Sequence, residues 1–262
     1  LIKKKLALPL CGNKNIAFDK IEVIDRINNK VSFKIMSIKE INKINSFFKK
    51  KKVKSDLKKI IAKRKNFLQN VNFSEPSLMG ILNLTPDSFS DGGKFNNRKK
   101  AKNHIQEMIK VGANIIDVGG ESTRPGSKTI NSKTEWERVK NIIKSFKKKH
   151  KKICLSIDTR KSEVMIKAIK YGVNLINDVS GFSYEIDSLY KLRKYKTAKV
   201  LHHMQGTPNT MQKNPNYKNV LLDIYDFFEE GIKKINNKKV ILDPGIGFGK
   251  NLKHNLTLIS KI

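Results

Sequence analysis

Short apolar runs alternate with amphipathic stretches from about residue 77 to the end of the chain. Runs this short are typical of buried strands, whereas helices need ten or more residues. Strands that alternate with helices along a chain form parallel sheets. The pattern therefore predicts an α/β fold in which six runs are strands. These are Leu78–Leu82, Asn114–Val118, Ile153–Ile157, Val173–Ile176, Lys199–Leu201 and Val240–Leu242.

The stretches between these runs carry apolar residues at helical spacing, so that each predicted helix buries one face. Gly112 and Gly172 follow two of the stripes, where glycine commonly ends a helix. The longest stripe precedes the last predicted strand. The stripes are Ala101, Ile105, Met108 and Ile109; Val164, Met165, Ala168 and Ile169; and Leu221, Ile224, Tyr225, Phe228, Ile232 and Ile235.

A polar or glycine-rich segment directly follows each of the six runs. In a β/α barrel the active site is built from the loops after many strands. An open doubly wound sheet instead concentrates its site at one switch point. Because all six predicted strand ends carry such segments, the pattern favours the barrel.

Residues 1–75 have a different texture, rich in lysine and poor in glycine, and we expect them to form a small N-terminal extension before a β/α domain over residues 76–262. The break falls at Ser74-Glu75-Pro76. Alternation over Lys30–Ile35 predicts a strand. Ser37 and Glu40 have the spacing of a capping box that opens a helix. A second basic helix is predicted after Ser55, using Leu57, Ile60, Ile61 and Arg64.

The formal net charge of +32 would attract nucleic acid. The lysines are spread throughout, however, and no basic stripe interleaved with aromatics or reading module appears, so we expect no nucleic-acid partner. No apolar run approaches the roughly 18–20 residues of a membrane span, and the apolar part of Leu6–Cys11 is too short for a signal peptide. The two cysteines, Cys11 and Cys154, lie far apart, as in a cytoplasmic protein, and Cys154 fits a buried core position.

The six segments after the predicted strands resemble, in order and spacing, those of the dihydropteroate synthase family. Any one of them alone would be a weak signal, but the resemblance covers residues 78–251. It implies a TIM (β/α)8 barrel. We place only about six strands, and so expect the barrel to be incomplete at its C-terminal end. The segments are NLTPDSFSDGG (83–93), GGESTRPG (119–126), SIDTR (156–160), INDVSG (176–181), HHMQG (202–206) and DPGIGFGK (243–250).

The family condenses 6-hydroxymethyl-7,8-dihydropterin pyrophosphate with p-aminobenzoate, forming dihydropteroate and pyrophosphate in folate biosynthesis. A pterin presents an edge of N–H donors, which calls for carboxylate and amide acceptors. The resemblance assigns Asp158, Asn177 and Asp243 to this ring. Their positions after three different strands let them converge on one ligand. Met204 and Gly247 are further substrate-binding residues by the same resemblance.

The resemblance also implies how the anionic groups and the second substrate are held. Asn83 and Asp91 would hold Mg²⁺, whose charge offsets that of the leaving pyrophosphate. Thr123 and Arg124 would contact anionic groups. Together with Asp158 and Asp243, Arg124 is a predicted catalytic residue. The apolar walls of the aminobenzoate pocket, where sulfonamides compete in the family, would be Phe89, Pro125 and Phe248.

Two alternative functions and one question of assembly remain open from sequence. A pterin-binding methyltransferase domain would share the barrel and the pterin contacts, but the 87–93 and 123–126 segments favour the synthase. A second alternative is that the chain is an inactive pterin-binding fragment. Whether the protein forms a homodimer is also left open.

Two motifs in this region have other readings. Gly245–Lys250 is too short for a Walker A loop. Because His202 and His203 point to opposite faces of a strand, we expect one to pack and the other to line the pocket edge.

Overall fold

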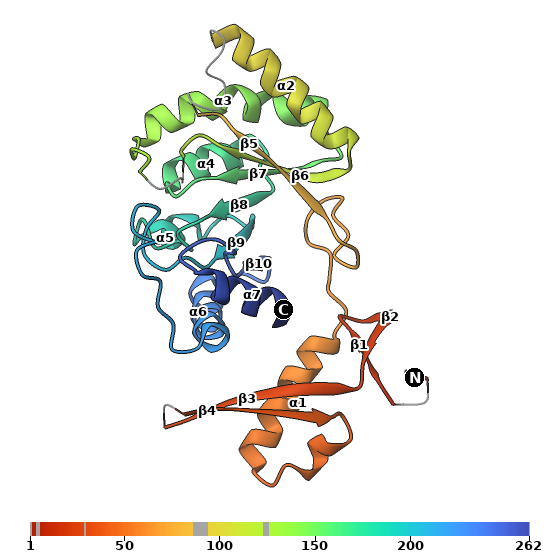
Figure 1. Cartoon of the computed structure of the whole chain (residues 1–262). Helices are drawn as coiled ribbons and strands as arrows, with labels where there is room; N and C mark the ends of the chain where they lie inside the picture. Colours follow the sequence, from red (N-terminus) through yellow and green to blue (C-terminus); the bar gives the residue numbers. More distant parts are fainter. Residues whose placement is uncertain (1, 4–5, 29, 86–93, 123–125, 262) are drawn as a thin grey trace. The chain divides into compact units, whose positions relative to one another are not determined.

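The computed structural model describes residues 2–3, 6–28, 30–85, 94–122 and 126–261, which form two compact units (Figure 1). The first comprises Leu1–Asn66 and Asn72–Pro76, and the second Phe67–Val71 and Ser77–Ile262. Within the described ranges, no helix combines the length and apolar character needed to cross a membrane.

The N-terminal unit contains two antiparallel hairpins and one long helix. β1 pairs with β2, and β3 pairs with β4 from Lys20–Ser37 to Ile27–Lys30. Alternation in both strands of the second pair explains why they form a hairpin. The elements are β1 (Leu8–Leu10), β2 (Asn13–Phe18), β3 (Lys20–Ile27), β4 (Lys30–Ser37), a 3₁₀ helix η1 (Glu40–Lys43) and α1 (Phe47–Ile61).

Two predictions for this unit were wrong in their helix boundaries. The Ser37 backbone N–H and hydroxyl do bond Glu40, at 2.7 and 2.9 Å, but the helix that follows has only four residues. The long helix begins before Ser55, because the hydroxyl of Ser46 accepts the free Lys49 N–H and caps it. It ends at Ile61, where the next residue is extended, so that Arg64 lies outside it.

The second unit contains one six-stranded sheet in which every neighbouring pair is parallel. The strand order is β10-β9-β8-β7-β6-β5, the reverse of chain order. The predicted strands are all present: β5 (Leu78–Asn83), β6 (Ala113–Gly119), β7 (Cys154–Asp158), β8 (Leu175–Asp178), β9 (Ala198–His202) and β10 (Val240–Asp243). The helices are α2 (Lys94–Lys110), α3 (Ser132–Lys149), α4 (Ser162–Lys170), α5 (Ser188–Leu192), α6 (Val220–Ile235) and α7 (Leu252–Lys261).

Strand alternation sends one set of side chains toward the helices and the other set away from them. Ile116, Leu155 and Ile176 are fully buried in the main core, where they meet side chains of α2, α3, α4 and α6. Figure 1 shows α2, α3 and α4 along this side of β5, β6 and β7. Asp117 and Asn177 occupy the intervening positions, so the opposite face, which we call the inner face, carries polar groups.

Two glycines end helices as the sequence predicted. Gly112 follows α2 with φ +103° and Gly172 follows α4 with φ +87°. Their N–H groups bond Ile109 O and Ile169 O, which satisfies the last turn of each helix. After each of these glycines the chain enters the next strand, β6 after α2 and β8 after α4. Because all six strands are parallel, their carboxyl ends and the polar segments that follow lie on the same side of the sheet.

Candidate active site

A row of four residues in register crosses four neighbouring strands at the end of the inner face, and three of the four carry polar side chains. Asn83 pairs in register with Gly119, Gly119 with Asp158, and Asp158 with Asn177. Residues in register on parallel strands point to the same side. Asn83 Oδ1 and Asp158 Oδ2 lie 3.1 and 3.4 Å from where a Cβ would stand on Gly119. The missing side chain thus gives the amide and the carboxylate their space.

Asp158 is the acidic centre of this row. Its carboxylate has no hydrogen-bond partner among the described residues and is half-buried. Burial raises the pKa of Asp158 well above its usual value, and the nearby Asp117 and Asp178 carboxylates raise it further. A ligand that donates N–H groups would offset this unfavourable environment for the ionised form.

Asp117, two residues before Gly119 on β6, forms a polar pair with Asn177 of this row. Asn177 Nδ2 donates to Asp117 Oδ2 at 2.8 Å. Asp117 is buried at 3% exposure, and burial raises the pKa of its carboxyl, although the Ser156 and Asn177 side chains act to lower it. Two side chains thus act on the Asp117 carboxyl, whereas Asn177 Oδ1 is buried without a partner among the described residues. A buried acceptor of this kind is normally satisfied, so the Asn177 oxygen indicates a ligand or water contact.

Asp243 lies further along the inner face, at the end of β10, and is held by two donors. Its Oδ2 lies 3.1 Å from His202 Nδ1, and its Oδ1 accepts the Gly245 N–H at 2.8 Å. Burial raises the pKa of Asp243, but the His202 and Gly245 bonds and the Lys250 charge outweigh it, leaving the pKa lowered. Asp243 is therefore the readily ionised acceptor of the site, in contrast to Asp158.

The neighbouring His203 points to the other side and is a packing residue, as the sequence suggested for one of the two histidines. It meets the Phe227 ring edge-on at 4.9 Å, and its Nδ1 lies 3.0 Å from Lys250 Nζ. Burial lowers the pKa of His203 to about 4 and that of Lys250 to about 8. Lys250 also donates to Phe248 O, which ties down the loop after β10.

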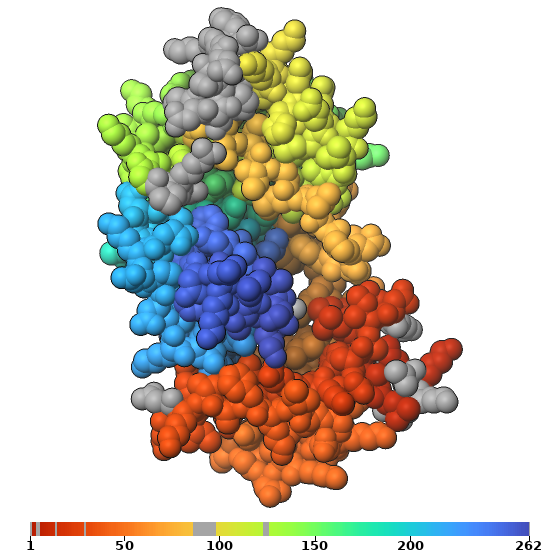
Figure 2. All heavy atoms as spheres, viewed as in Figure 1, coloured from red at the N-terminus to blue at the C-terminus, as the bar shows by residue number. Residues whose placement is uncertain are grey.

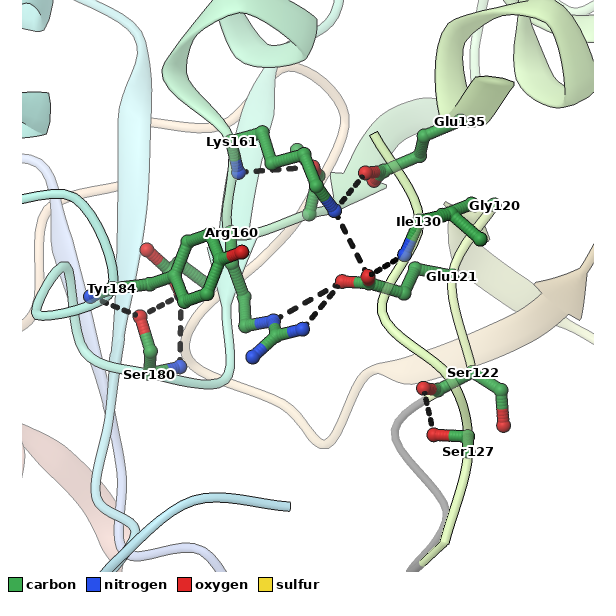
Figure 3. Close-up of polar contacts among 12 residues, drawn as sticks. Gly120, Glu121, Ser122, Ser127, Ile130, Glu135, Arg160, Lys161, Ser180 and Tyr184 are labelled. Carbon is green, nitrogen blue, oxygen red and sulfur yellow. Dashed lines mark hydrogen bonds and ion pairs between the residues drawn. The ribbon is translucent and has the colours of Figure 1, made fainter. Parts of the chain in front are cut away.

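A buried ion-pair cluster joins the loops after β6 and β7 (Figure 3). Arg160 donates to Glu121 Oε2 through Nε and Nη2, at 3.1 and 2.7 Å. Lys161 Nζ lies between two carboxylates, 3.0 Å from Glu121 Oε1 and 2.7 Å from Glu135 Oε2. Burial raises the pKa of Glu121, but the Arg160 and Lys161 bonds prevail and lower it overall. The cluster ties the segment directly after Asp158 to the loop after β6 and to α3.

The remaining predicted site residues divide into two groups. Met204 is half-buried after β9, Gly247 O accepts from Gln212, and the Phe248 ring meets His202 edge-on at 4.8 Å. Phe248 therefore lies beside the His202–Asp243 pair. The other five lie outside the described residues: Phe89, Asp91, Thr123, Arg124 and Pro125.

Sequence reasoning missed the partners of the predicted residues. A signal was present for Asp117, which is a lone charge inside the apolar run 115–118. Glu121 and Lys161 carried no signal of pairing, because they lie far apart in sequence and the second partner of Lys161, Glu135, belongs to a helix. Among the described residues, no group of three or more His, Cys, Asp or Glu side chains could hold a metal ion.

Comparison with known proteins gives consistent matches over the second unit. A family model described as pterin binding enzyme matches residues 79–262. The dihydropteroate synthase of Escherichia coli (strain K12) is 41% identical over 198 residues, covering 74% of this chain and 70% of that protein. A crystal structure of Yersinia pestis dihydropteroate synthase with a sulfonamide drug has a TM-score of 0.67 and 40% identity, covering 72% and 70%. A Clostridium difficile dihydropteroate synthase crystallised in the presence of pteroic acid has a TM-score of 0.66 and 38% identity, covering 75% and 72%.

Proposed function

The chain belongs to the dihydropteroate synthase family of pterin-binding enzymes, and we infer that it condenses 6-hydroxymethyl-7,8-dihydropterin pyrophosphate with p-aminobenzoate. The products are dihydropteroate and pyrophosphate, so the enzyme is a folate-biosynthesis transferase of an alkyl group other than methyl. Its ligands are small molecules, in line with the pteroic acid of the Clostridium difficile enzyme.

One observation of this structure carries the proposal. Asp158 and Asn177 Oδ1 stand in register on neighbouring strands and have no hydrogen-bond partner among the described residues. With the Asp243 carboxylate on the same face, they form a set of acceptors. The edge of a pterin is a set of N–H donors. A ligand with that edge satisfies the acceptors that the folded chain leaves open.

The same residues account for the chemistry. The amine nitrogen of p-aminobenzoate attacks the methylene carbon of the pterin, and the bond from that carbon to the pyrophosphate oxygen breaks. The oxygen leaves with the bonding electrons, and the amine loses a proton. Positive charge develops on the pterin side in this step. The carboxylates Asp158 and Asp243 bind that side, and so stabilise the transition state electrostatically.

The leaving pyrophosphate requires positive charge, for which we propose Mg²⁺ together with Arg124 and Thr123. Amide and carboxylate oxygens are the ligands that Mg²⁺ takes in proteins, usually alongside waters and substrate phosphates. Asn83 offers its Oδ1 at the end of β5, beside Asp158 and Gly119, and Asp91 would supply the carboxylate. When bound, Mg²⁺ would neutralise charge on the leaving group.

We further propose that the six strands are part of a (β/α)8 barrel. The outer strand β5 exposes Ile81, at 61%, on the inner face. The helix α7, dark blue at the surface in Figure 2, exposes Leu252, Leu256 and Ile259. Exposed apolar side chains on an outer strand and on the helix that follows the other outer strand fit surfaces against which further strands and helices of a barrel pack.

We also propose a cytoplasmic location, on the basis of the free thiols of Cys11 and Cys154.

Substitution of the two carboxylates tests the pterin site. We expect Asp158→Asn and Asp243→Asn each to abolish binding of the pterin pyrophosphate with the fold intact, because each replaces one acceptor oxygen of a carboxyl group with an amide nitrogen that only donates. Calorimetric titration of the folded variants measures this. Asp187→Asn, which removes an exposed carboxylate paired with Lys191, is the matched control and should bind normally. Near-normal affinity in both site variants would contradict the assignment.

The role of Arg124 is tested separately with two ligands. We expect Arg124→Ala to weaken binding of the pterin pyrophosphate more than that of the same pterin without pyrophosphate, because a guanidinium fork suits phosphate. Equal losses for the two ligands would count against an anion contact. Formation of dihydropteroate from the two substrates, and no methyl transfer to a corrinoid, separates the synthase from a pterin-binding methyltransferase.

A further inference from the structure

The Asn177 amide presents two different ends to its surroundings. Its nitrogen donates to Asp117 Oδ2 at 2.8 Å, whereas its oxygen is buried with no partner among the described residues. A free amide could turn over and exchange the two ends. In this site the turn would place the Asn177 oxygen against an oxygen of the ionised Asp117 carboxylate, which only accepts hydrogen bonds. The orientation is therefore decided by Asp117.

We propose that Asp117 is a positioning residue that fixes the Asn177 amide, so that Asn177 Oδ1 is always presented to the pterin as an acceptor. The inference rests on the proposed function. It adds a reason why the site selects a ligand edge made of donors. Asp117 bonds Asn177, and in this proposal it acts on the ligand through that residue.

The position of Asp117 suits this role. It lies on β6, in register with Ser156 of β7, which in turn is in register with Leu175 of β8. Asn177 is two residues beyond Leu175 and in register with Asp158. The bond from Asn177 to Asp117 therefore crosses β7 diagonally, from the level of Asp158 to that of Ser156. Asp117 is 3% exposed, so water does not replace it as the partner of Asn177. A hydrogen bond to a carboxylate is stronger in a buried environment than in water.

The consequence is a rule of specificity. A ligand with an N–H group opposite Asn177 gains a hydrogen bond, whereas a ligand with an acceptor there leaves two buried acceptors facing each other. A site that hydrogen-bonds one arrangement rejects the other strongly, because the buried groups would be unpaired. Loss of Asp117 removes this preference, since the amide is then free to turn.

The first experiment removes the acceptor and compares the result with a variant that keeps one. Asp117→Leu replaces the carboxylate with an apolar group of similar size. We expect it to weaken pteroic acid binding by roughly tenfold or more, on the scale of a lost charge-assisted hydrogen bond. Asp117→Asn retains an oxygen that accepts from Asn177. We expect its affinity to stay within about threefold of wild type, as rescue by the conservative residue.

The second experiment exchanges the two side chains. Asn177→Asp alone places two carboxylates together and should bind pteroic acid poorly. Adding Asp117→Asn restores a donor–acceptor pair of opposite direction, and again leaves an oxygen of residue 177 facing the ligand. We therefore expect the double variant to bind better than Asn177→Asp by at least about tenfold. A purely structural role for Asp117 would not produce this recovery.

The outcomes separate the two proposals. Calorimetry with pteroic acid is performed on variants whose thermal unfolding is cooperative. Equal affinity of wild type and Asp117→Leu overturns the positioning role while leaving the pterin site in place. If Asp117→Leu does not fold, the exchange decides, and no recovery in the double variant overturns the role. A wild-type protein that does not bind pteroic acid overturns both proposals.

Discussion

Replacing Lys161 by methionine removes the cation that two buried carboxylates share. Lys161 Nζ lies 3.0 Å from Glu121 and 2.7 Å from Glu135, and the three side chains are 5%, 4% and 0% exposed. Glu121 keeps Arg160 as a partner in the variant. Glu135 loses the cation that the structure gives it and has no access to water. The variant therefore isolates the effect of one unpaired carboxylate in the core.

The expected loss follows from this geometry. Breaking a buried pair by removing one partner costs about 3–5 kcal/mol, because the remaining charge is neither solvated nor paired. In a domain of about 150–250 residues, each kcal/mol lowers Tm by about 2–4 °C. We thus expect Lys161→Met to lower Tm by roughly 6–20 °C at neutral pH. Adding Glu135→Gln should recover part of the loss, since the orphaned charge is then gone.

Thermal and denaturant unfolding followed by circular dichroism provide the assay. Lys167→Met is the matched control, because Lys167 pairs with Glu163 at 2.6 Å on an exposed helix face. Exposed pairs contribute under about 1 kcal/mol, so this control should unfold almost as wild type does. A loss for Lys161→Met as small as that of the control would refute the reasoning. So would a double variant that is less stable than Lys161→Met.

Three further outcomes are expected. Glu121 has a lowered pKa, so its stabilising contribution is present above its ordinary value of 4.5 and is lost as pH falls through the folded value. Unfolding of Glu121→Gln should therefore vary less with pH below 4.5 than wild type, and an unchanged slope would be contrary. Gly119→Ala should weaken pteroic acid binding in a folded protein, because its Cβ would stand 3.1 Å from Asn83 Oδ1 and 3.4 Å from Asp158 Oδ2; normal calorimetric affinity would show that the row can adjust. Cys154 is fully buried with a pKa raised to about 11, so a thiol reagent at pH 8 should titrate Cys11 in the native protein and both cysteines only after unfolding. Rapid native reaction of both thiols would contradict the burial.

The sheet was predictable because its signal is local. In β7, apolar residues fill every position of the strand except Ser156 and Asp158, and a helical stripe starts soon after. That pattern places the strand, its end and the polar segment without any knowledge of partners. In the N-terminal unit the signal is weaker. Lys20–Ile27 alternates about as well as Lys30–Ile35, and only pairing between the two makes the hairpin visible.

The contacts within the site were not predictable, since they depend on register and on side-chain direction. That Asp158 and Asn177 lie side by side follows from the positions of the strand ends. That Asn177 is held by Asp117 depends on a diagonal across β7 which no sequence spacing encodes. The pairing of His202 with Asp243 likewise requires β9 and β10 to be neighbours with these two residues in register.

The two buried lysines nearest the site pair with groups other than Asp158. Lys161 is held by Glu121 and Glu135, and Lys250 by His203 and by a backbone carbonyl. The charges that act most on Asp158 are carboxylates, and they raise its pKa. A net charge of +32 thus coexists with a site made of acceptors. The site gains most from a ligand that brings its own donors, and a flat donor edge reaches several strand ends at once, as a single ammonium group cannot.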